Sequence, residues 1–298
     1  MSAVADPLHP EEFDVPVAGG ALRVCRWPGT GPVVLAAHGI TANALAFAGL
    51  AEALDGRVRL VAPDLRGRAG SSGLPGPYGM AAHAADLIAV ADHLGLDRVP
   101  LAGHSMGGFA VAATAAAYPD RVSAALLIDG GVALPVPDTV DVDEVLTAVI
   151  GPAMRRLSMT FAGPEDYLAF FREHPALGPY WTPAVEAYVL RDLTGTPPEL
   201  RSSCALAAVR ADASDTLITR DTVTAVHRLG CPARLMWAPR GLLDEDQGLY
   251  DPDRLAAAAL DPARIAVERV PGVNHYTILF DPDGVQRVAE RVLELVTT

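Results

Sequence analysis

Residues 103–107 read Gly-His-Ser-Met-Gly, with Ser105 at the centre of a G-x-S-x-G pattern. The apolar segment 99–102 is typical of a buried strand, and the alanine-rich segment 109–117 is typical of a helix. At such a strand-to-helix turn, small residues two positions away on either side relieve crowding and expose the serine hydroxyl. We therefore predict that Ser105 is a nucleophile. The alternative is a glycine-rich turn in which the serine only caps a helix.

A serine hydroxyl becomes nucleophilic when an imidazole takes its proton and a carboxylate orients that imidazole. Asp244 follows the apolar run 233–237, and His275 follows the run 265–270. Groups beyond the carboxyl ends of parallel strands meet at one edge of the sheet. The chain order Ser, Asp, His is the order expected for a triad on such a sheet.

The elements that must position these residues alternate between strand and helix over most of the chain, which predicts a mostly parallel sheet. A hairpin is expected over 15–27 around Gly19 and Gly20. Further strands are expected over 32–37, 57–62, 99–102, 124–128, 233–237 and 265–270. Helices are expected over 43–54, 80–94, 109–117, 251–260 and 283–296. The fold class is therefore α/β, an eight-stranded type of sheet with helices on both faces.

The pattern changes between residues 132 and 229, where prolines are frequent and no clear strand is apparent. This predicts a three-part organisation, with a core in segments 1–131 and 230–298 and a helical cap over 132–229. The aromatic residues of the insertion all fall between 161 and 188. They form either the insertion's own small core or an apolar lid over a substrate pocket. As pocket residues we expect Phe161, Phe170, Phe171, Tyr180 and Trp181.

Composition excludes several functions. The net charge is −13 and no basic run occurs, which argues against nucleic acids or anionic membranes as partners. The sequence contains no lysine, so lysine-based covalent catalysis is excluded. The histidines lack metal-site spacing and the glycines lack a nucleotide loop, so we expect neither a metal nor a cofactor. The few separated cysteines, and the absence of an apolar leader or membrane span, favour the cytoplasm.

Five motifs together resemble the α/β-hydrolase fold serine hydrolases, over nearly the whole chain. They are His38-Gly39, Pro63-Asp64-Leu65-Arg66-Gly67, the segment 103–108, Gly241-Leu242-Leu243-Asp244 and Asn274-His275. The resemblance implies an esterase-like or lactonase-like enzyme with a helical cap.

Residue by residue, the resemblance makes Ser105 the nucleophile, His275 the base and Asp244 the acid. Asp129 stays open as the alternative acid, because it ends the sixth strand. The resemblance also implies an oxyanion hole formed by the backbone amides of Met106 and Ile40.

Three further side chains in these motifs receive structural roles. His38 is expected to shape the oxyanion loop. Asp64 and Arg66 are expected to form an ion pair at a strand end.

The resulting hypothesis is a serine hydrolase that cleaves a carboxylic ester or lactone with an apolar acyl part through an acyl-enzyme. Its substrate would be a small apolar ester-like molecule. Thioesterase, C–C bond hydrolase and cofactor-free haloperoxidase-like activities use the same triad and remain open. A non-catalytic small-molecule-binding protein on the same fold is the alternative from another class. Serine at position 105 argues against chemistry that needs a carboxylate nucleophile. The sequence does not indicate an oligomeric state.

Overall fold

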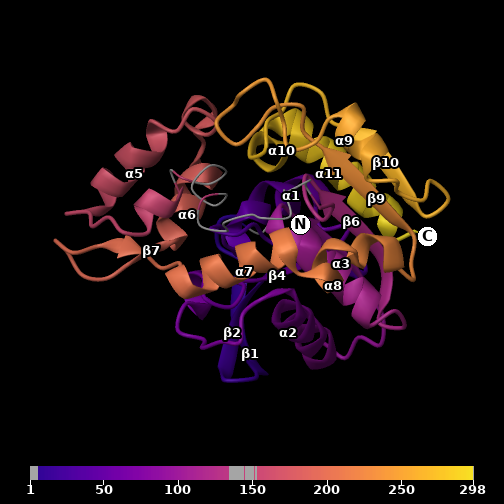
Figure 1. Ribbon diagram of the computed structural model, residues 1–298. Helices are drawn as coiled ribbons and strands as arrows, with labels where there is room; N and C mark the ends of the chain where they lie inside the picture. Colours follow the sequence, from indigo (N-terminus) through magenta and orange to yellow (C-terminus); the bar gives the residue numbers. More distant parts are fainter. Residues whose placement is uncertain (1–5, 134–143, 145–150, 152, 298) are drawn as a thin grey trace.

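The computed structural model describes residues 6–133, 144, 151 and 153–297 (Figure 1). Eight strands form one sheet in the order β1-β2-β4-β3-β5-β6-β9-β10. Their bounds are β1 Glu11–Val17, β2 Gly20–Arg26, β3 Val33–Ala37, β4 Arg59–Pro63, β5 Val99–His104, β6 Val122–Ile128, β9 Ala233–Trp237 and β10 Ile265–Arg269. Only β1–β2 and β2–β4 pair antiparallel, and the other neighbours are parallel. The predicted fold class, including the N-terminal hairpin, is confirmed.

Helices cover both faces of this sheet. The helices of the main domain are α1 Ala48–Leu54, α2 Met80–His93, α3 Met106–Ala117, α9 Pro252–Ala257, α10 Thr277–Phe280 and α11 Pro282–Leu295. Short 3-10 turns are η1 Ala44–Phe47 and η2 Ala69–Ser71. Proline is the first residue of both α9 and α11, where its missing amide hydrogen costs nothing and its fixed φ suits a helix.

The central strands are buried on both faces, and their alternate side chains enter two different cores. Val34, Ala102 and Leu126 point to the core beneath α1 and α11. Leu35 and Leu101 point to the core beneath α2 and α3. Continuous apolar runs are required here because a parallel sheet with helices on both faces has no solvent-facing side. Ser105 and Asp129 accordingly follow the last residues of β5 and β6.

The segment between β6 and β9 is mainly helical, and part of it extends to the left of the sheet in Figure 1. Its elements are α5 Pro164–Arg172, η3 Gly178–Tyr180, α6 Pro183–Arg191, β7 Leu193–Thr194, β8 Arg201–Ser202, α7 Leu206–Ile218, α8 Arg220–Val223 and η4 Ala225–Arg228. The expectation that this segment lacks strands is wrong, because β7 and β8 form a short antiparallel pair. The start of the expected cap, residues 134–143, lies outside the described residues.

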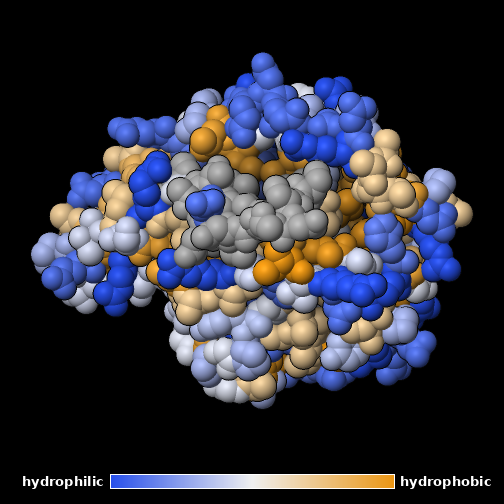
Figure 2. All heavy atoms as spheres, in the orientation of Figure 1, coloured by the Kyte–Doolittle hydropathy of each residue, from blue (hydrophilic) through white to orange (hydrophobic). Residues whose placement is uncertain are grey.

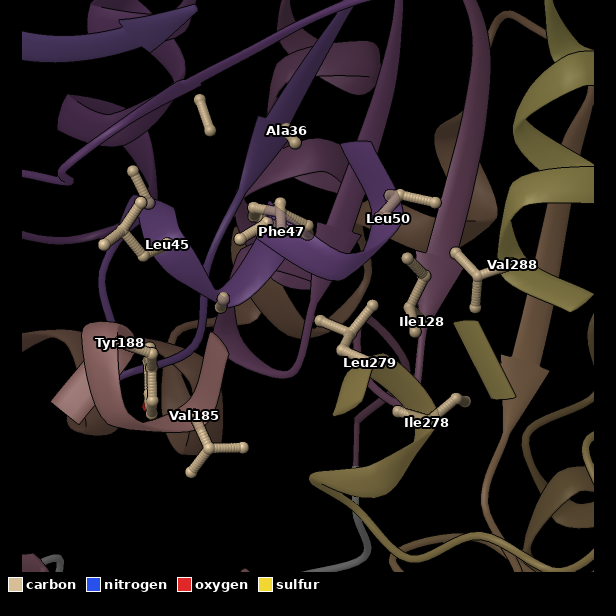
Figure 3. Close-up of a cluster of buried hydrophobic side chains, with 14 of the residues drawn as sticks. Ala36, Leu45, Phe47, Leu50, Ile128, Val185, Tyr188, Ile278, Leu279 and Val288 are labelled. Atoms are coloured by element: carbon tan, nitrogen blue, oxygen red, sulfur yellow. The ribbon is translucent and has the colours of Figure 1, made fainter. Parts of the chain in front are cut away.

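The insertion packs directly onto the main domain. Figure 3 shows Val185 and Tyr188 of α6 close to Leu45 and Phe47 of η1, within one continuous apolar cluster. A buried ion pair reinforces this contact, because Arg191 at the end of α6 donates from Nη2 to Asp64 Oδ2 at 2.8 Å. Burying these side chains removes apolar surface from water, which stabilises the docked insertion by about 25 cal/mol per Å².

The expected ion pair between Asp64 and Arg66 is wrong. Arg66 instead forms a buried two-pronged pair with Asp86 of α2, at 3.0 and 2.7 Å. Asp64 accepts from Arg191 and from the amides of Ala44 and Gly70. The two neighbouring side chains leave the end of β4 in different directions. Sequence proximity therefore did not produce a pair.

None of the helices in the described part of the chain is both long and apolar enough to cross a membrane.

Candidate active site

Ser105 occupies a strained turn between β5 and α3. Its φ and ψ are 57° and −124°, a conformation that non-glycine residues rarely adopt. The turn closes only around glycines. A Cβ on Gly103 would lie 2.1 Å from the carbonyl oxygen of Gly107, and a Cβ on Gly107 would lie 2.0 Å from that of Ala37. Strain at a non-glycine residue persists where the surrounding structure imposes it, which is typical of functional sites.

His275 is held by Asp129. Its Nδ1 lies 2.6 Å from Asp129 Oδ2, and both side chains are buried, at 3% and 0% exposure. Asp129 follows β6 directly, with φ 44°. Its second oxygen, Oδ1, accepts a hydrogen bond of 3.0 Å from the amide of Ala238. Both carboxylate oxygens therefore have partners, and His275 presents only Nε2 for proton transfer.

The expectation that Asp244 orients His275 is wrong for the described geometry. Asp244 lies in the loop after β9 and accepts from Arg240 Nε at 2.8 Å and from Asn274 Nδ2 at 3.1 Å. Its side chain is 28% exposed. The hydrogen bonds from Arg240 and Asn274 hold the pKa of Asp244 below its usual value. The carboxylate that contacts His275 is that of the alternative acid, Asp129.

Asp244 contacts the histidine turn indirectly, because it accepts a hydrogen bond from Asn274, the residue before His275. The Asn274 side chain donates to Asp244 and to the carbonyl oxygen of Ala176 in the insertion. Its Oδ1 accepts from the amides of Tyr276 and Thr277, which begins α10. Asn274 thus fixes the turn that carries His275.

Ser105 and His275 line one cavity together with Gly39, Ile40 and Met106. Within the described residues Ser105 Oγ does not hydrogen-bond His275. Catalytic hydrogen bonds in enzymes without substrate are often long and tighten only when substrate binds. Ser105 and Gly39 are in close contact, since a Cβ on Gly39 would lie 3.3 Å from Ser105 Cβ. The loop of the predicted oxyanion hole therefore adjoins the serine.

His38 supports this loop. Its Nε2 accepts from the amide of Leu65 at 2.8 Å, so Nδ1 carries the hydrogen and donates to the carbonyl oxygen of Gly39 at 2.8 Å. Burial lowers the pKa of His38 to about 3, which keeps the ring neutral. The geometry gives His38 the structural position expected from the sequence.

His104 lies beside His275, with ring centroids 4.8 Å apart. Its Nε2 hydrogen-bonds the carbonyl oxygen of His275 at 2.8 Å. Burial, with a contribution from the neighbouring His275, lowers the pKa of His104 to about 3. A neutral His104 therefore braces the backbone of His275 without adding a charge.

The sequence did not identify Arg68, which lies beneath the oxyanion loop. Its fully buried guanidinium donates to the carbonyl oxygens of Ile40 and Arg66, at 2.9 and 2.8 Å. Arg68 also forms an ion pair with Asp212 of α7, which in turn contacts His83 of α2 at 3.0 Å. The only sequence signal was an arginine next to the Pro-Asp-Leu-Arg-Gly motif, and its partner lies far along the chain.

The expected pocket residues divide into two groups. Phe170 and Phe171 line the cavity, whereas Phe161, Tyr180 and Trp181 are absent from its described lining. Phe161 packs edge-on against neighbouring rings in the insertion's core. Trp181 stacks under Arg172 and donates from Nε1 to Glu186 at 3.2 Å. The aromatic cluster therefore includes both a core and a pocket wall.

The cavity wall is mostly apolar. Residues from the insertion, from η1, α3 and α10, and from the loop after β9 contribute to it, including Ala46, Phe109, Phe170, Leu217, Leu242 and Phe280. In Figure 2 hydrophobic residues reach the surface directly above and below the grey atoms, and hydrophilic residues lie along the upper rim. The described residues include no cluster of three His, Cys, Asp or Glu side chains suited to a metal ion.

Comparisons with known proteins agree with this architecture. The pattern of the alpha/beta hydrolase fold family matches residues 32–161. The chain is similar to lipase LipV of Mycobacterium tuberculosis, with 38% identity over 43% of this chain and 48% of the lipase. An uncharacterised protein of the same species, Rv2715, is 35% identical over 38% of this chain and 33% of its own length. The aligned regions thus span less than half of these two relatives.

Other similarities extend over nearly the whole chain. A 2-(acetamidomethylene)succinate hydrolase of Mesorhizobium japonicum is 28% identical over 87% of this chain and 86% of that protein. The crystal structure of E-2-(acetamidomethylene)succinate hydrolase superposes with a TM-score of 0.78 at 23% identity, covering 97% of this chain and 100% of that one. The thioesterase domain from the curacin biosynthetic pathway gives 0.73 at 21% identity, with coverage of 97% and 100%. At these identities the structural likeness establishes the fold alone.

Proposed function

We propose that this chain, which has the α/β-hydrolase fold, is a serine hydrolase that cleaves a carboxylic ester or lactone with an apolar acyl part. In this proposal Ser105 is the nucleophile, His275 the general base and Asp129 the orienting acid. The helical segment between β6 and β9 acts as the cap over the substrate.

One observation carries the proposal. A buried carboxylate hydrogen-bonds Nδ1 of a histidine at 2.6 Å, and that histidine shares a cavity with a serine on a strained turn. Asp129 keeps the hydrogen of His275 on Nδ1, so Nε2 is free to accept the serine proton. The carboxylate also stabilises the imidazolium that forms when this proton arrives.

The first half of the reaction forms the acyl-enzyme. His275 Nε2 takes the proton of Ser105 while Oγ bonds to the substrate carbonyl carbon, and the carbonyl oxygen becomes an oxyanion. In this proposal the amides of Ile40 and Met106 donate to that oxygen, and each such donor contributes about 3–4 kcal/mol in comparable enzymes. The tetrahedral intermediate then collapses, the ester C–O bond breaks, and the leaving alcohol takes the proton from His275.

The second half releases the acid. Water gives a proton to His275 Nε2 as its oxygen attacks the acyl carbon, and a second tetrahedral intermediate forms. The bond to Ser105 Oγ breaks, and the serine recovers its proton from His275. Ester and water are consumed, and carboxylic acid and alcohol are produced, with the enzyme unchanged.

The cavity wall supports the choice of acyl group. Phe170, Leu217 and Phe280 offer aromatic and aliphatic surface to the substrate. Each CH₂ group of an acyl chain buried there contributes about 0.8 kcal/mol to binding. Among the similar proteins, the lipase and the 2-(acetamidomethylene)succinate hydrolase are both hydrolases by name, which supports hydrolysis without selecting the leaving group.

A fluorophosphonate probe tests the nucleophile. The wild-type protein should be labelled covalently on Ser105, and mass spectrometry of the digested protein should place the adduct there. Ser105→Ala should abolish both labelling and ester turnover. Full esterase turnover in Ser105→Ala, or labelling at another residue, would contradict the proposal.

A substrate panel tests the bond that is cleaved. Matched ester, lactone, thioester and β-diketone substrates should give the largest kcat/KM for an ester or a lactone. A thioester or β-diketone preferred by tenfold or more would reassign the leaving group while leaving the triad intact. Tight binding of an apolar molecule, with neither labelling nor turnover of any substrate, would identify a binding protein instead.

A further inference from the structure

Arg156 is a buried cation in the wall of the otherwise mostly apolar cavity. It is 3% exposed, comes from the insertion, and lines the same cavity as Ser105. Its guanidinium makes a single hydrogen bond to the described chain, from Nη2 to the carbonyl oxygen of Thr41 at 3.4 Å. Nε is buried and has no partner within the described residues. Such a group is costly to bury unless a ligand satisfies it.

The nearby carboxylate of Asp192 does not satisfy the hydrogen-bond donors of Arg156. The nearest carboxylate oxygen, Oδ2, lies 3.6 Å from Arg156 Nη2, beyond hydrogen-bond length. The same carboxylate already accepts hydrogen bonds from four other side chains, those of Tyr167, Ser202, Ser203 and Cys204. Asp192 therefore neutralises part of the charge but does not accept a hydrogen bond from the guanidinium, and Nε has no acceptor within the described residues.

The arginine is held between the aromatic cavity wall and the oxyanion loop. Its guanidinium carbon lies 5.0 Å from the ring centroid of Phe171, a cavity-lining residue, in a cation–π contact. Its hydrogen bond to Thr41 joins it to the residue after Ile40, in the oxyanion loop. Burial works against the charge of Arg156, but Asp192 outweighs it and the pKa of the arginine is raised. A fixed cation therefore lies next to the loop that adjoins the serine.

His174 adds a neutral donor to the same wall. Its Nδ1 accepts from the amide of Ala176 at 3.2 Å, which leaves the ring hydrogen on Nε2. Burial and the nearby charge of Arg156 lower the pKa of His174 to about 4. Glu245 acts in the opposite direction but does not reverse the shift. A neutral imidazole can donate one hydrogen bond without neutralising an anion.

We propose that Arg156, with His174, binds a carboxylate of the substrate, so that the substrate class is an ester or lactone that also bears a free carboxylate. This inference rests on the proposed serine hydrolase function. A carboxylate would supply the acceptors that the guanidinium lacks, through two parallel charge-assisted hydrogen bonds. Its short apolar spacer would lie against the aromatic wall between Arg156 and Ser105.

Two matched substrate pairs test the inference. The first pair, monoethyl succinate and ethyl butyrate, places the carboxylate on the acyl side. The second pair, 3-(butyryloxy)propanoic acid and propyl butyrate, places it on the alcohol side. For each pair, kcat/KM for acid release gives a preference ratio of acid-bearing to neutral ester. The wild-type ratio should exceed ten in at least one pair, with the difference expressed mainly in KM.

Variants assign that ratio to the arginine. Arg156→Met should reduce the ratio to about one, and Arg156→Lys should retain part of it, because an ammonium keeps the charge but loses the planar fork. Arg155→Met is the matched control, since Arg155 is exposed and the change in net charge is the same. This control should keep the wild-type ratio. Circular dichroism should verify that each variant is folded.

Three outcomes would overturn the inference. One is a wild-type ratio of one or less in both pairs, which decides the matter even if Arg156→Met fails to fold. Another is an Arg156→Met variant that keeps the wild-type ratio, and a third is an equal loss of ratio in Arg155→Met. If neutral esters are hydrolysed and the fluorophosphonate labels Ser105, only the carboxylate subsite fails. If neither labelling nor turnover occurs, the serine hydrolase proposal fails as well.

Discussion

Two acidic turns on neighbouring strands look alike in sequence and differ in structure. Asp129 follows β6 and Asp244 follows β9, and both have positive φ values, 44° and 64°. Asp129 is fully buried and hydrogen-bonded to His275. Asp244 is partly exposed and bound to Arg240 and Asn274. Their surroundings, and not their residue type or strand-end position, separate the candidate acid from a supporting residue.

Loop geometry explains the difference. Asp129 is the first residue after β6, and its amide donates to the carbonyl oxygen of Met236 in β9 at 2.7 Å. The sheet itself therefore fixes its carboxylate. Asp244 lies seven residues after the end of β9, in a turn where the amide of Gly241 donates to the carbonyl oxygen of Glu245 and the amide of Asp244 donates to that of Gly241. An acid at the end of a rigid strand can orient a histidine more accurately than an acid in a loop.

The largest expected effect is on catalysis at the first turn. Asp129→Asn should lower kcat/KM for an ester about 10³–10⁴-fold, because the amide cannot stabilise the imidazolium and favours the wrong tautomer of His275. Steady-state kinetics on an ester that the wild type hydrolyses would measure this. A fall of tenfold or less would remove Asp129 from the triad.

The second largest expected effect is on the free energy of unfolding, which should fall more in Asp129→Ala than in Asp244→Ala. Asp129→Ala leaves the amide of Ala238 and Nδ1 of His275 without their partner in a buried site, which should cost about 2–3 kcal/mol of unfolding free energy. Asp244→Ala removes a half-exposed ion pair and should cost about 1 kcal/mol or less. Urea unfolding monitored by circular dichroism gives both values. Equal losses would mean that burial does not distinguish the turns.

The free energy of unfolding should depend on pH through His104, which packs against His275, and not through Asp244. Burial lowers the pKa of His104, which lies beside His275, to about 3 in the folded protein, from 6.5 for a histidine in water. Below pH 6.5 the unfolded chain binds a proton at His104, whereas the folded chain binds it only near pH 3. The free energy of unfolding therefore decreases as the pH falls from 6.5 to about 3. The loss is about 1.4 kcal/mol per pH unit for each such histidine.

His104→Asn should reduce the stability loss between pH 7.5 and 5.5 by about 1.4 kcal/mol. His9→Asn is the control, because His9 is exposed and should leave the loss unchanged. Asp244 contributes nothing in this interval, since the lowered pKa of its carboxylate confines its titration to below 3.8. An unchanged loss in His104→Asn would show that this ring is not kept neutral by the fold.

The smallest effect belongs to the second turn. Asp244→Asn should change kcat/KM by less than threefold, because its amide oxygen can still accept from Asn274 and the Arg240 contact is half-exposed. The same ester assay measures it beside Asp129→Asn. A loss as large as that of Asp129→Asn would restore Asp244 as the acid and reverse the comparison.

Much of the fold followed from local pattern. Apolar runs such as 32–37 and 99–102 predicted buried strands, and Gly103 and Gly107 marked the serine turn because no side chain fits there. The pairing of side chains did not follow. Asp64 turned to Arg191 and Arg66 to Asp86, although the two residues stand side by side in one motif. Periodicity encodes which face is buried, but partners are chosen by distances across the fold.

The sequence by itself determined the α/β sheet, the serine turn at Ser105 and a histidine beyond the last strand, because these depend on backbone sterics and hydrophobic periodicity. Only the tertiary structure chose between Asp129 and Asp244, brought Arg68 beneath the oxyanion loop and left Arg156 in the cavity wall. Those outcomes depend on which strand ends are neighbours in the sheet and on which hydrogen-bond and ion-pair partners surround each buried charged side chain. Electrostatic energy varies with distance and burial, and neither is written in the order of residues.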